Sequence, residues 1–350
     1  MVKIGIIGVG RISAQHISGI KEFGNAEITA ICDIDTEKLK TVGDELNIPE
    51  EYRFTDYFDL INCDAVEAVE ICTPNYLHVP MATAVAKAGK PVQVEKPLGI
   101  SATKGIDELV AAINKNGVIN MMDFSYRFKS AVRYAKDLIE QGKLGKLLNV
   151  NIQYLQSGVF IPGRRLEWRF VKEYAGSGTL ADLGVHLIDL TRFLIGDFKS
   201  ICAMQSTVVK ERMKLDCDEY EPVLVDDITS FVAKLEGDVI ANFMVTKCAL
   251  GEGNTIIYEL YGTKGVIKFN LNNPDEIALC LDVDYNDRET VKAETISVPT
   301  EYKLGEQECF IRTLHGENLP YFPDIKEGLK AQEVVDAALK SAETQEMVKL

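Results

Sequence analysis

The chain is short of positive charge, with 38 lysines and arginines against 53 aspartates and glutamates and a formal net charge of -15. Nucleic acids and anionic membrane surfaces are bound through clusters of basic side chains. The acidic balance therefore argues against nucleic acid and against membrane as partners.

Long apolar runs and closely spaced cysteines are also missing. No segment stays apolar for the roughly 20 residues of a membrane-spanning helix. A strand-like run begins as early as Lys3, which leaves no room for a secretory signal. The eight cysteines lack the paired spacing of a zinc site or a redox dithiol. We therefore expect a cytoplasmic protein with mostly buried, reduced thiols and no metal site.

The remaining composition is that of an ordinary globular protein. The chain has 350 residues, of which 46% are hydrophobic and 26% charged. This length is sufficient for two domains with separate cores. The sequence contains no internal repeat and no low-complexity segment.

A glycine loop follows the first apolar run. Residues 3–7 read as a strand, and a helical pattern runs from the loop through Phe23. Gly8 permits a tight turn, and Gly10 lets backbone N–H groups approach a phosphate at the start of the helix. Ser13 replaces the third glycine, where only a compact side chain is needed. Such a loop is either an ordinary turn or a pyrophosphate site. If it is a pyrophosphate site, we expect Gly8, Gly10, Arg11 and Ile12 to contact the cofactor.

The next strand ends in the acid that a dinucleotide site requires. Residues 27–32 form an apolar run, and Asp33 lies 20 residues after Ser13. This spacing is typical of the carboxylate that binds the adenosine ribose hydroxyls. Asp33, Ile34 and Asp35 offer no cation for a 2′-phosphate, and two carboxylates would repel one. The sequence therefore favours NAD over NADP.

Strands and helices then alternate as in a doubly wound parallel sheet. Apolar runs at 66–72, 92–94 and 118–122 alternate with helical patterns at 78–87 and 101–114. Polar residues stand just past the carboxyl ends of these strands, the edge where such sheets bind ligands. They are Thr73, Asn75, Glu95, Lys96, Asp123, Tyr126 and Arg127, and Pro74 between the first two breaks the apolar run. We predict an α/β fold whose Rossmann domain occupies residues 1–123.

A different pattern begins near residue 124. A helix is predicted at 130–141 and a strand at 148–154, and the runs 228–235, 239–246, 256–261 and 266–269 read as antiparallel hairpins. In residues 239–246 both faces of the strand carry apolar residues, so both faces of an open sheet must be buried against other parts of the protein. We expect helices of the chain to cover one face and another subunit to cover the other.

The helical pattern from Thr179 to Ile195 carries the sharpest polar feature. At 100° per residue, Asp182, His186 and Asp189 share one arc, and five leucines share another. Asp182 and His186 can be a solvated pair on the surface of the helix. Alternatively, the Asp182 carboxylate fixes the tautomer and basicity of the His186 imidazole. Because the chain has only four histidines, we favour the second reading.

Lys96 follows the strand at 92–94. A lysine in such a place is usually solvated, but Pro97 keeps Lys96 out of helical geometry at the edge of the sheet. Its ammonium can polarise a hydroxyl or carbonyl oxygen, and Glu95 can hold it in position.

Together these motifs resemble, over essentially the full length, the glucose-fructose oxidoreductase and inositol dehydrogenase (GFO/IDH/MocA) family. The resemblance rests on the loop Gly8 to Gly10, the segments Cys72 to His78, Glu95 to Leu98 and Gly178 to Asp189, the pairs Trp168-Arg169 and Asp226-Asp227, and the turn Gly262 to Gly265. The series is specific to the family and much less specific to a substrate.

This resemblance implies an architecture and an activity. A Rossmann domain is followed by an α/β domain, residues 124–323, whose large open, mostly antiparallel sheet forms a homodimer or homotetramer. A last helix, within residues 324–350, packs back on the Rossmann domain. The implied enzyme is an NAD(P)-dependent dehydrogenase that oxidises a secondary alcohol of a sugar, sugar derivative or cyclitol, or runs the reverse reduction.

The resemblance also assigns residues to roles. Lys96 matches the catalytic lysine, and Asp182 and His186 match the substrate-binding and proton-transfer pair. Tyr126 and Arg127 are expected to contact substrate. The positions expected to line the cofactor are Thr73, Pro74, Asn75, His78, Glu95, Lys96, Trp168 and Arg169.

In the mechanism that follows, His186 takes the hydroxyl proton, Lys96 stabilises the oxyanion, and hydride passes to nicotinamide C4. Either Lys96 or His186 can be the primary base. An NAD-dependent glycoside hydrolase that uses transient oxidation, a nonsugar reductase and a dinucleotide-binding regulator without turnover remain alternatives. Arg164 and Arg165 can meet an anionic group of a substrate or form structural ion pairs.

Overall fold

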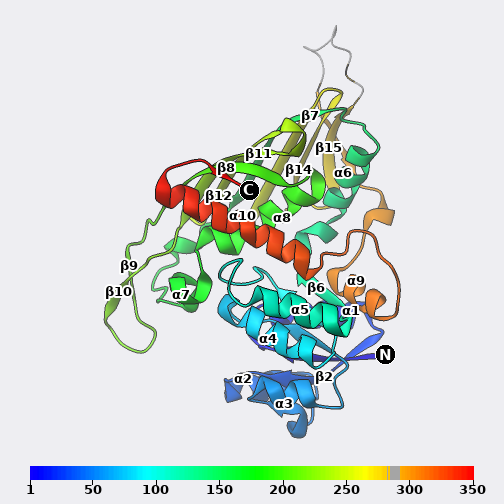
Figure 1. Cartoon of the computed structure of the whole chain (residues 1–350), viewed down its shortest axis with the longest axis vertical. Helices are drawn as coiled ribbons and strands as arrows, with labels where there is room; N and C mark the ends of the chain where they lie inside the picture. The colour runs from blue at the N-terminus through cyan, green and yellow to red at the C-terminus, as the bar shows by residue number, and fades with distance from the viewer. Residues whose placement is uncertain (282, 284–291) are drawn as a thin grey trace. The chain divides into compact units, whose positions relative to one another are not determined.

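The computed structural model describes residues 1–281, 283 and 292–350 (Figure 1). These residues divide into two compact units, one of residues 1–124 with 304–330 and one of residues 125–303 with 331–350. This division differs from the predicted boundaries, because residues 304–323 group with the Rossmann unit. Helix α9 (Glu306–Leu314) explains the difference, since its Ile311 belongs to the Rossmann core.

The first unit contains a six-stranded parallel sheet in the order β3-β2-β1-β4-β5-β6. This is the doubly wound topology that the alternating pattern predicts. Its strands are β1 (Val2–Ile7), β2 (Ala26–Cys32), β3 (Arg53–Phe54), β4 (Ala68–Ile71), β5 (Val92–Glu95) and β6 (Asn120–Asp123). The strands β4 and β5 are buried along their whole length, as strands covered on both faces must be.

The helices of this unit follow their strands. They are α1 (Ser13–Phe23), α2 (Thr36–Glu45), α3 (Tyr57–Asn62), α4 (Asn75–Lys87) and α5 (Ile106–Asn116). The helix expected at 101–114 begins later, at Ile106, because Gly105 has φ +76° and cannot continue a helix from residue 101. The helix expected from His78 begins earlier, at Asn75, directly after Pro74.

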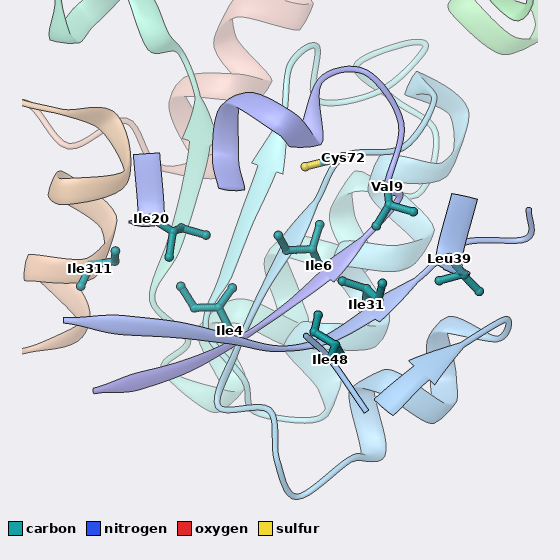
Figure 2. Packing of buried hydrophobic residues seen from close by; sticks show 9 residues of the cluster. All are labelled: Ile4, Ile6, Val9, Ile20, Ile31, Leu39, Ile48, Cys72 and Ile311. Atoms are coloured by element: carbon teal, nitrogen blue, oxygen red, sulfur yellow. The ribbon is translucent and has the colours of Figure 1, made fainter. Parts of the chain in front are cut away.

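The core of the first unit lies between β1, β2 and the helices on one face of the sheet. Figure 2 shows Ile4, Ile6 and Ile31 of the strands packed with Ile20 of α1 and Ile311 of α9. The cluster also includes Val9, Leu39, Ile48 and Cys72. These apolar contacts hold the glycine loop and the start of α1 on the sheet.

The last helix, α10 (Ile325–Thr344), has residues in both units. Residues 325–330 group with the Rossmann unit, where a Cβ on Gly328 would lie 2.7 Å from Met122 Cγ, so glycine allows the close approach. Residues from 331 onward group with the second unit, where the Ala203 amide donates to Ser341 Oγ. None of the helices in the described ranges is long and apolar enough to cross a membrane.

The second unit contains, over its described residues, a nine-stranded sheet in the order β16-β15-β14-β13-β7-β12-β11-β8-β17. The hairpins β11–β12 and β13–β14 are antiparallel, as predicted, and β7 pairs with β12 in parallel. The strands are β7 (Leu147–Leu155), β8 (Phe198–Ser206), β11 (Ile228–Leu235), β12 (Ile240–Thr246), β13 (Thr255–Gly262), β14 (Gly265–Asn270), β15 (Glu276–Leu281), β16 (Glu294–Ser297) and β17 (Val348–Lys349). A separate small hairpin joins β9 (Glu211–Met213) to β10 (Tyr220–Pro222).

One face of the large sheet is buried and the other carries exposed apolar side chains. The buried face includes Phe231, Phe243 and Tyr258, whose hydroxyl donates to the carbonyl of Leu187 in the helix that packs there. On strands β8, β11 and β12 the other face exposes Met204, Val232, Ile240 and Met244.

The helices of the second unit are α6 (Ser130–Glu140), the short α7 (Lys172–Ala175) and α8 (Val185–Leu194), which is preceded by a π-helical turn, Leu180–Gly184. The single α-helix expected from Thr179 to Ile195 is therefore wrong in its first part. Every residue from Val185 to Leu194 is buried, so His186 and Asp189 of the predicted polar arc lie inside the protein. A helix that is buried all round has to pair its polar side chains inside the protein.

Candidate active site

In the first unit, the glycine loop has the geometry that a pyrophosphate site requires. Gly8 has φ +90°, and a Cβ there would lie 2.7 Å from the carbonyl oxygen of Cys72, so only glycine fits. A Cβ on Gly10 would meet nothing within 4 Å, which leaves open space over the loop. Ser13 Oγ donates to the Gly10 carbonyl at 2.7 Å and closes the turn into α1. Arg11 is exposed and Ile12 half-buried at the start of this helix.

Asp33 is tied to the loop. Its Oδ2 accepts the Val9 amide at 2.9 Å, and its Oδ1 accepts the Asp35 amide at 3.0 Å. Asp35 caps α2 and pairs with the ammonium of Lys38 at 2.9 Å. Lys38 is a cation near the acidic pair that the sequence prediction overlooked, although it is engaged by Asp35.

The segment after β4 is held by a buried histidine. His78, in the first turn of α4, has Nδ1 2.7 Å from the Pro97 carbonyl and Nε2 2.8 Å from the Thr73 carbonyl. Burial lowers the pKa of this imidazole. Both predicted cofactor segments, Thr73 to Asn75 and Glu95 to Pro97, are thus joined by one ring. A neutral imidazole carries a single N–H, so His78 donates to only one of these two carbonyls.

Lys96 is half-buried at the end of β5, between Glu95 and Pro97, and the Lys96–Pro97 peptide is cis. The Glu95 side chain is buried. Its Oε2 accepts the backbone amide of Lys96 at 3.0 Å, and its Oε1 lies 3.3 Å from His16 Nε2. The prediction did not include His16, whose only sequence signal is its place one helical turn after the glycine loop.

In the second unit, Asp182 lies in the π-helical turn and His186 in the first turn of α8. Asp226 fixes the start of this turn, because its carboxylate accepts the Gly178 amide at 2.8 Å, the Leu180 amide at 2.9 Å and the Thr229 hydroxyl. A π-helical turn closes with i to i+5 hydrogen bonds, here from the Val185 amide to the Leu180 carbonyl. Such turns are found frequently at functional sites.

Asp182 has a partner that the sequence did not reveal. Lys247, directly after β12, places its ammonium 2.7 Å from Asp182 Oδ2. Lys247 is buried, whereas Asp182 keeps 27% of its side chain exposed. The two residues are far apart in the chain, and only the packing of the π-helical turn against the sheet brings them together.

His186 is buried against an aromatic wall. The Tyr126 ring meets the imidazole edge-on with centroids 4.6 Å apart. The Tyr126 hydroxyl lies 2.8 Å from that of Tyr154, which donates to Asn254 Oδ1, while Asn254 Nδ2 donates back to Tyr126. Burial raises the pKa of Tyr154, so this phenol stays protonated. This closed cycle of hydroxyl and amide groups holds Tyr126 in place beside His186.

Arg127, which is predicted to contact substrate, is paired inside the second unit. Its guanidinium is buried and forms a bidentate ion pair with Asp189, with Nε donating at 2.8 Å and Nη2 at 2.5 Å. Asp189, on the predicted polar arc, is therefore bound to Arg127. In the described structure these two side chains anchor α8 to the segment after β6.

Trp168 and Arg169 lie in a short 3-10 helix, Trp168–Phe170, with the guanidinium 4.3 Å from the indole ring centre. Arg164 pairs with Glu167, and Arg165 donates to the carbonyls of Lys214 and Cys217. Of the two readings for Arg164 and Arg165, the structure therefore supports ion pairs and hydrogen bonds within the protein.

Comparison with known proteins gives the chain's relatives. Residues 2–124 match the NAD-binding Rossmann fold of an oxidoreductase family, and residues 132–268 match the GFO/IDH/MocA C-terminal domain. Levoglucosan dehydrogenase of Pseudarthrobacter phenanthrenivorans is 33% identical over 246 residues, 67% of this chain and 63% of that protein. Glucose-6-phosphate 3-dehydrogenase of Bacillus subtilis is 27% identical over 347 residues, 96% of this chain and 95% of that protein.

The fold has a solved counterpart. A structure of levoglucosan dehydrogenase in complex with NADH and levoglucosan matches with a TM-score of 0.90 at 27% identity, over 99% of both chains. Fold and motifs therefore define an NAD-binding oxidoreductase with a Rossmann domain and a second α/β domain. The chain belongs to the GFO/IDH/MocA family, as its sequence motifs predicted.

Proposed function

We propose that this protein is a dehydrogenase that transfers hydride from a secondary alcohol of a sugar, sugar derivative or cyclitol to nicotinamide C4 of NAD. The observation that carries the proposal is the arrangement around His186. A buried imidazole lies against Tyr126, and the neighbouring turn presents a partly exposed carboxylate, Asp182, paired with Lys247. A carboxylate and an ammonium at such a site can bind adjacent hydroxyl groups of a polyol.

In the proposed reaction His186 accepts the hydroxyl proton, because the imidazole pKa lies near neutrality in water. Asp182 accepts a hydrogen bond from the substrate. Lys96 stabilises the oxyanion that develops on the carbinol oxygen. NAD supplies the hydride acceptor when it is bound.

The cofactor would be held by the first unit. Helix α1 begins three residues after Gly10, where a Cβ would meet nothing within 4 Å, and the amide groups of a helix start suit a pyrophosphate. Asp33 suits the ribose hydroxyls, and the acidic pair Asp33 and Asp35 favours NAD over NADP. Fluorescence titration with NADH and NADPH tests this preference, and equal affinity for both would contradict it.

The deciding experiment is a substrate panel. Reduced-nicotinamide absorbance is followed with NAD and with NADP over inositols, aldoses, sugar phosphates and anhydrosugars, with Lys96→Ala run beside the parent protein. We expect a signal with NAD that the variant loses. Sugar release without NADH would favour a hydrolase, and NAD binding without any turnover would favour a regulator.

The exposed apolar face of the sheet supports a homodimer or homotetramer. We further propose a cytoplasmic location, because each of the eight cysteines, all within the described residues, is a free thiol.

A further inference from the structure

A cluster of buried ionisable groups surrounds His16 in the first unit. The imidazole is 2% exposed, and its Nδ1 lies 2.7 Å from Glu70 Oε2. Its Nε2 lies 2.6 Å from Asp123 Oδ2 and 3.3 Å from Glu95 Oε1. The side-chain amide of Gln307 lies 3.1 Å from Nδ1 as well. Ionised carboxylates accept hydrogen bonds, so ionised Glu70 and Asp123 at the two nitrogens favour an imidazolium.

The surroundings agree with a charged ring. Burial opposes the charge, and the thiol of Cys72, whose own pKa burial raises to about 11, is neutral at pH 7. The Asp123 carboxylate, 2.6 Å from Nε2, favours the charged ring. Burial and the nearby charge of Asp123 also raise the pKa of Glu306, whose protonated carboxyl donates a hydrogen bond to Asp123.

A bound metal ion is the competing reading for the same atoms. His16, Glu95 and Asp123 are residue types that ligate divalent ions, and their ligand atoms lie close together. Two ligands on one zinc ion, each at about 2.0–2.2 Å, stand roughly 3 Å or more apart. The 2.6 Å between His16 Nε2 and Asp123 Oδ2 is a hydrogen-bond distance. A shared proton therefore fits this spacing, and an ion does not.

The cluster is connected to Lys96 through the side chain of Glu95. One oxygen of Glu95 faces His16, and the other accepts the Lys96 backbone amide at 3.0 Å. His16 belongs to α1, the helix that begins after the glycine loop, and Glu95 ends β5. A single ring thus connects the start of the cofactor helix to the strand end that carries Lys96.

We propose that His16 is a positioning residue for Lys96, because its protonated ring holds Glu95 and through it the Lys96 backbone. This inference rests on the proposed catalytic role of Lys96. The His16 ring also favours the ionised form of Glu95, the residue next to Lys96. Burial and the charge of Asp123 raise the pKa of Glu95 to about 7, and the hydrogen bond and charge of His16 lower it. Without His16, Glu95 would therefore be protonated at neutral pH.

The charged and titratable groups around Glu95 come from every element packed there. They are His16 of α1, Glu70 and Cys72 at β4, Asp123 of β6, Glu306 of α9 and Lys96 itself. Among these, His16 and Lys96 are the cations that favour an ionised Glu95.

The first test reads the ring directly. Nitrogen NMR of the full-length protein resolves the protonation of its four histidines, and His16→Asn identifies the His16 signals. We expect both nitrogens of His16 to carry protons from pH 6 to pH 8. A neutral ring, with one unprotonated nitrogen at pH 7, would overturn the proposal whatever the enzyme's substrate.

The second test measures kcat, KM and the pH profile of His16→Asn. The control is His315→Asn, which removes an exposed histidine of the same unit. We expect kcat to fall about 10- to 100-fold in His16→Asn, while KM for the sugar changes less than threefold. The inflection of the pH profile near neutral pH should move to a higher pH. The control should match the parent protein.

Further variants separate the possible failures. If His16→Asn does not fold, Glu95→Gln takes its place, and it should abolish the inflection near neutral pH. A folded His16→Asn with the parent kcat and pH profile overturns the positioning role, while loss of activity in Lys96→Ala leaves the proposed function standing. An active Lys96→Ala overturns both.

Discussion

At the residue scale, the partner of each charged side chain decides its role. Arg127 and Asp189 neutralise each other inside the second unit, and Arg164 is engaged by Glu167. Asp182 is paired too, yet it keeps part of its carboxylate exposed. Breaking a buried pair by removing one partner leaves an uncompensated charge, which is strongly destabilising. Removing one partner of the buried pair Arg127–Asp189 should therefore destabilise the protein, whereas the partly exposed carboxylate of Asp182 can also contact a ligand.

The proposed catalytic residues give the first prediction. Lys96→Ala and His186→Ala should each reduce turnover by roughly two to four orders of magnitude, because they remove an oxyanion partner and a proton acceptor. The measurement is kcat with a substrate found in the panel. Near-normal rates in both variants would show that the assignment is wrong.

Lys247 gives the second prediction. Lys247→Met removes the ammonium that lies 2.7 Å from Asp182, and kcat/KM should fall about 10- to 100-fold, the range for a hydrogen bond to a charged group. Lys247→Arg keeps the positive charge and should lose less. Equal values for the methionine variant and the parent would contradict a role for this ion pair.

Glu95 gives a prediction for stability against pH. Burial raises its pKa to about 7, above the usual value of a glutamate. The native state therefore binds the proton more tightly than the unfolded state, and stability from this group is present at acidic pH and lost as pH rises through 7. The Glu95→Gln protein should lack this decline, which is on the order of 2 kcal/mol.

Chemical denaturation at pH 5 and pH 7.5 measures the difference. The free energy of unfolding of Glu95→Gln minus that of the parent should be larger at pH 7.5 than at pH 5. The same difference at both pH values would show that Glu95 does not titrate in this range.

At the element scale, the π-helical turn is the feature that shapes the second group of site residues. The segment that leads into this turn contains Gly178. Because glycine has no side chain, the backbone there can pass close to the carbonyl of Asp226. The carboxylate of Asp226 then accepts the amide groups at the start of the turn. The family motif Asp226-Asp227 thus has a structural function here, since Asp227 likewise accepts the amides of Val208 and Val209.

Gly178→Ala tests this element. A Cβ would lie 2.0 Å from the Asp226 carbonyl oxygen, so the turn must move, and we expect a loss of at least about 1–3 kcal/mol in the free energy of unfolding. Activity should fall as Asp182 is displaced. Gly253→Ala is the control for stability, because its Cβ would meet nothing within 4 Å. Equal stability of the two variants would contradict the packing argument.

At the scale of the whole molecule, the large sheet has one buried face and one face that the described residues leave exposed on strands β8, β11 and β12. Met204, Val232, Ile240 and Met244 lie on three neighbouring strands and are exposed. Exposed apolar patches of this kind often mark protein interfaces. The pattern agrees with the expectation that a second subunit covers this face.

Met244→Asp should therefore shift the protein toward a monomer, because a carboxylate buried in the interface would be unpaired. Sedimentation velocity at micromolar concentration measures the effect. Leu215→Asp, in the connection between β9 and β10, makes the same change on another exposed apolar residue and should leave the assembly unchanged. A parent protein that sediments as a monomer would disprove the assembly.

Local patterns alone determined much of this protein. The alternation of apolar runs and helices predicted the doubly wound parallel sheet, although not its short edge strand β3, and the glycine loop with Asp33 predicted the NAD-binding unit. These features are readable because periodicity and turn chemistry depend on residues close together in the chain. The family motifs likewise lie in short continuous segments.

Only the tertiary structure decided which charges meet. Lys247 reaches Asp182 and Arg127 reaches Asp189 across long separations in the chain, and His16 joins Glu70, Glu95 and Asp123 from three different strands. The π-helical turn also depends on a distant partner, Asp226. Sequence periodicity describes one element at a time, whereas burial and ion pairing depend on how elements pack against one another.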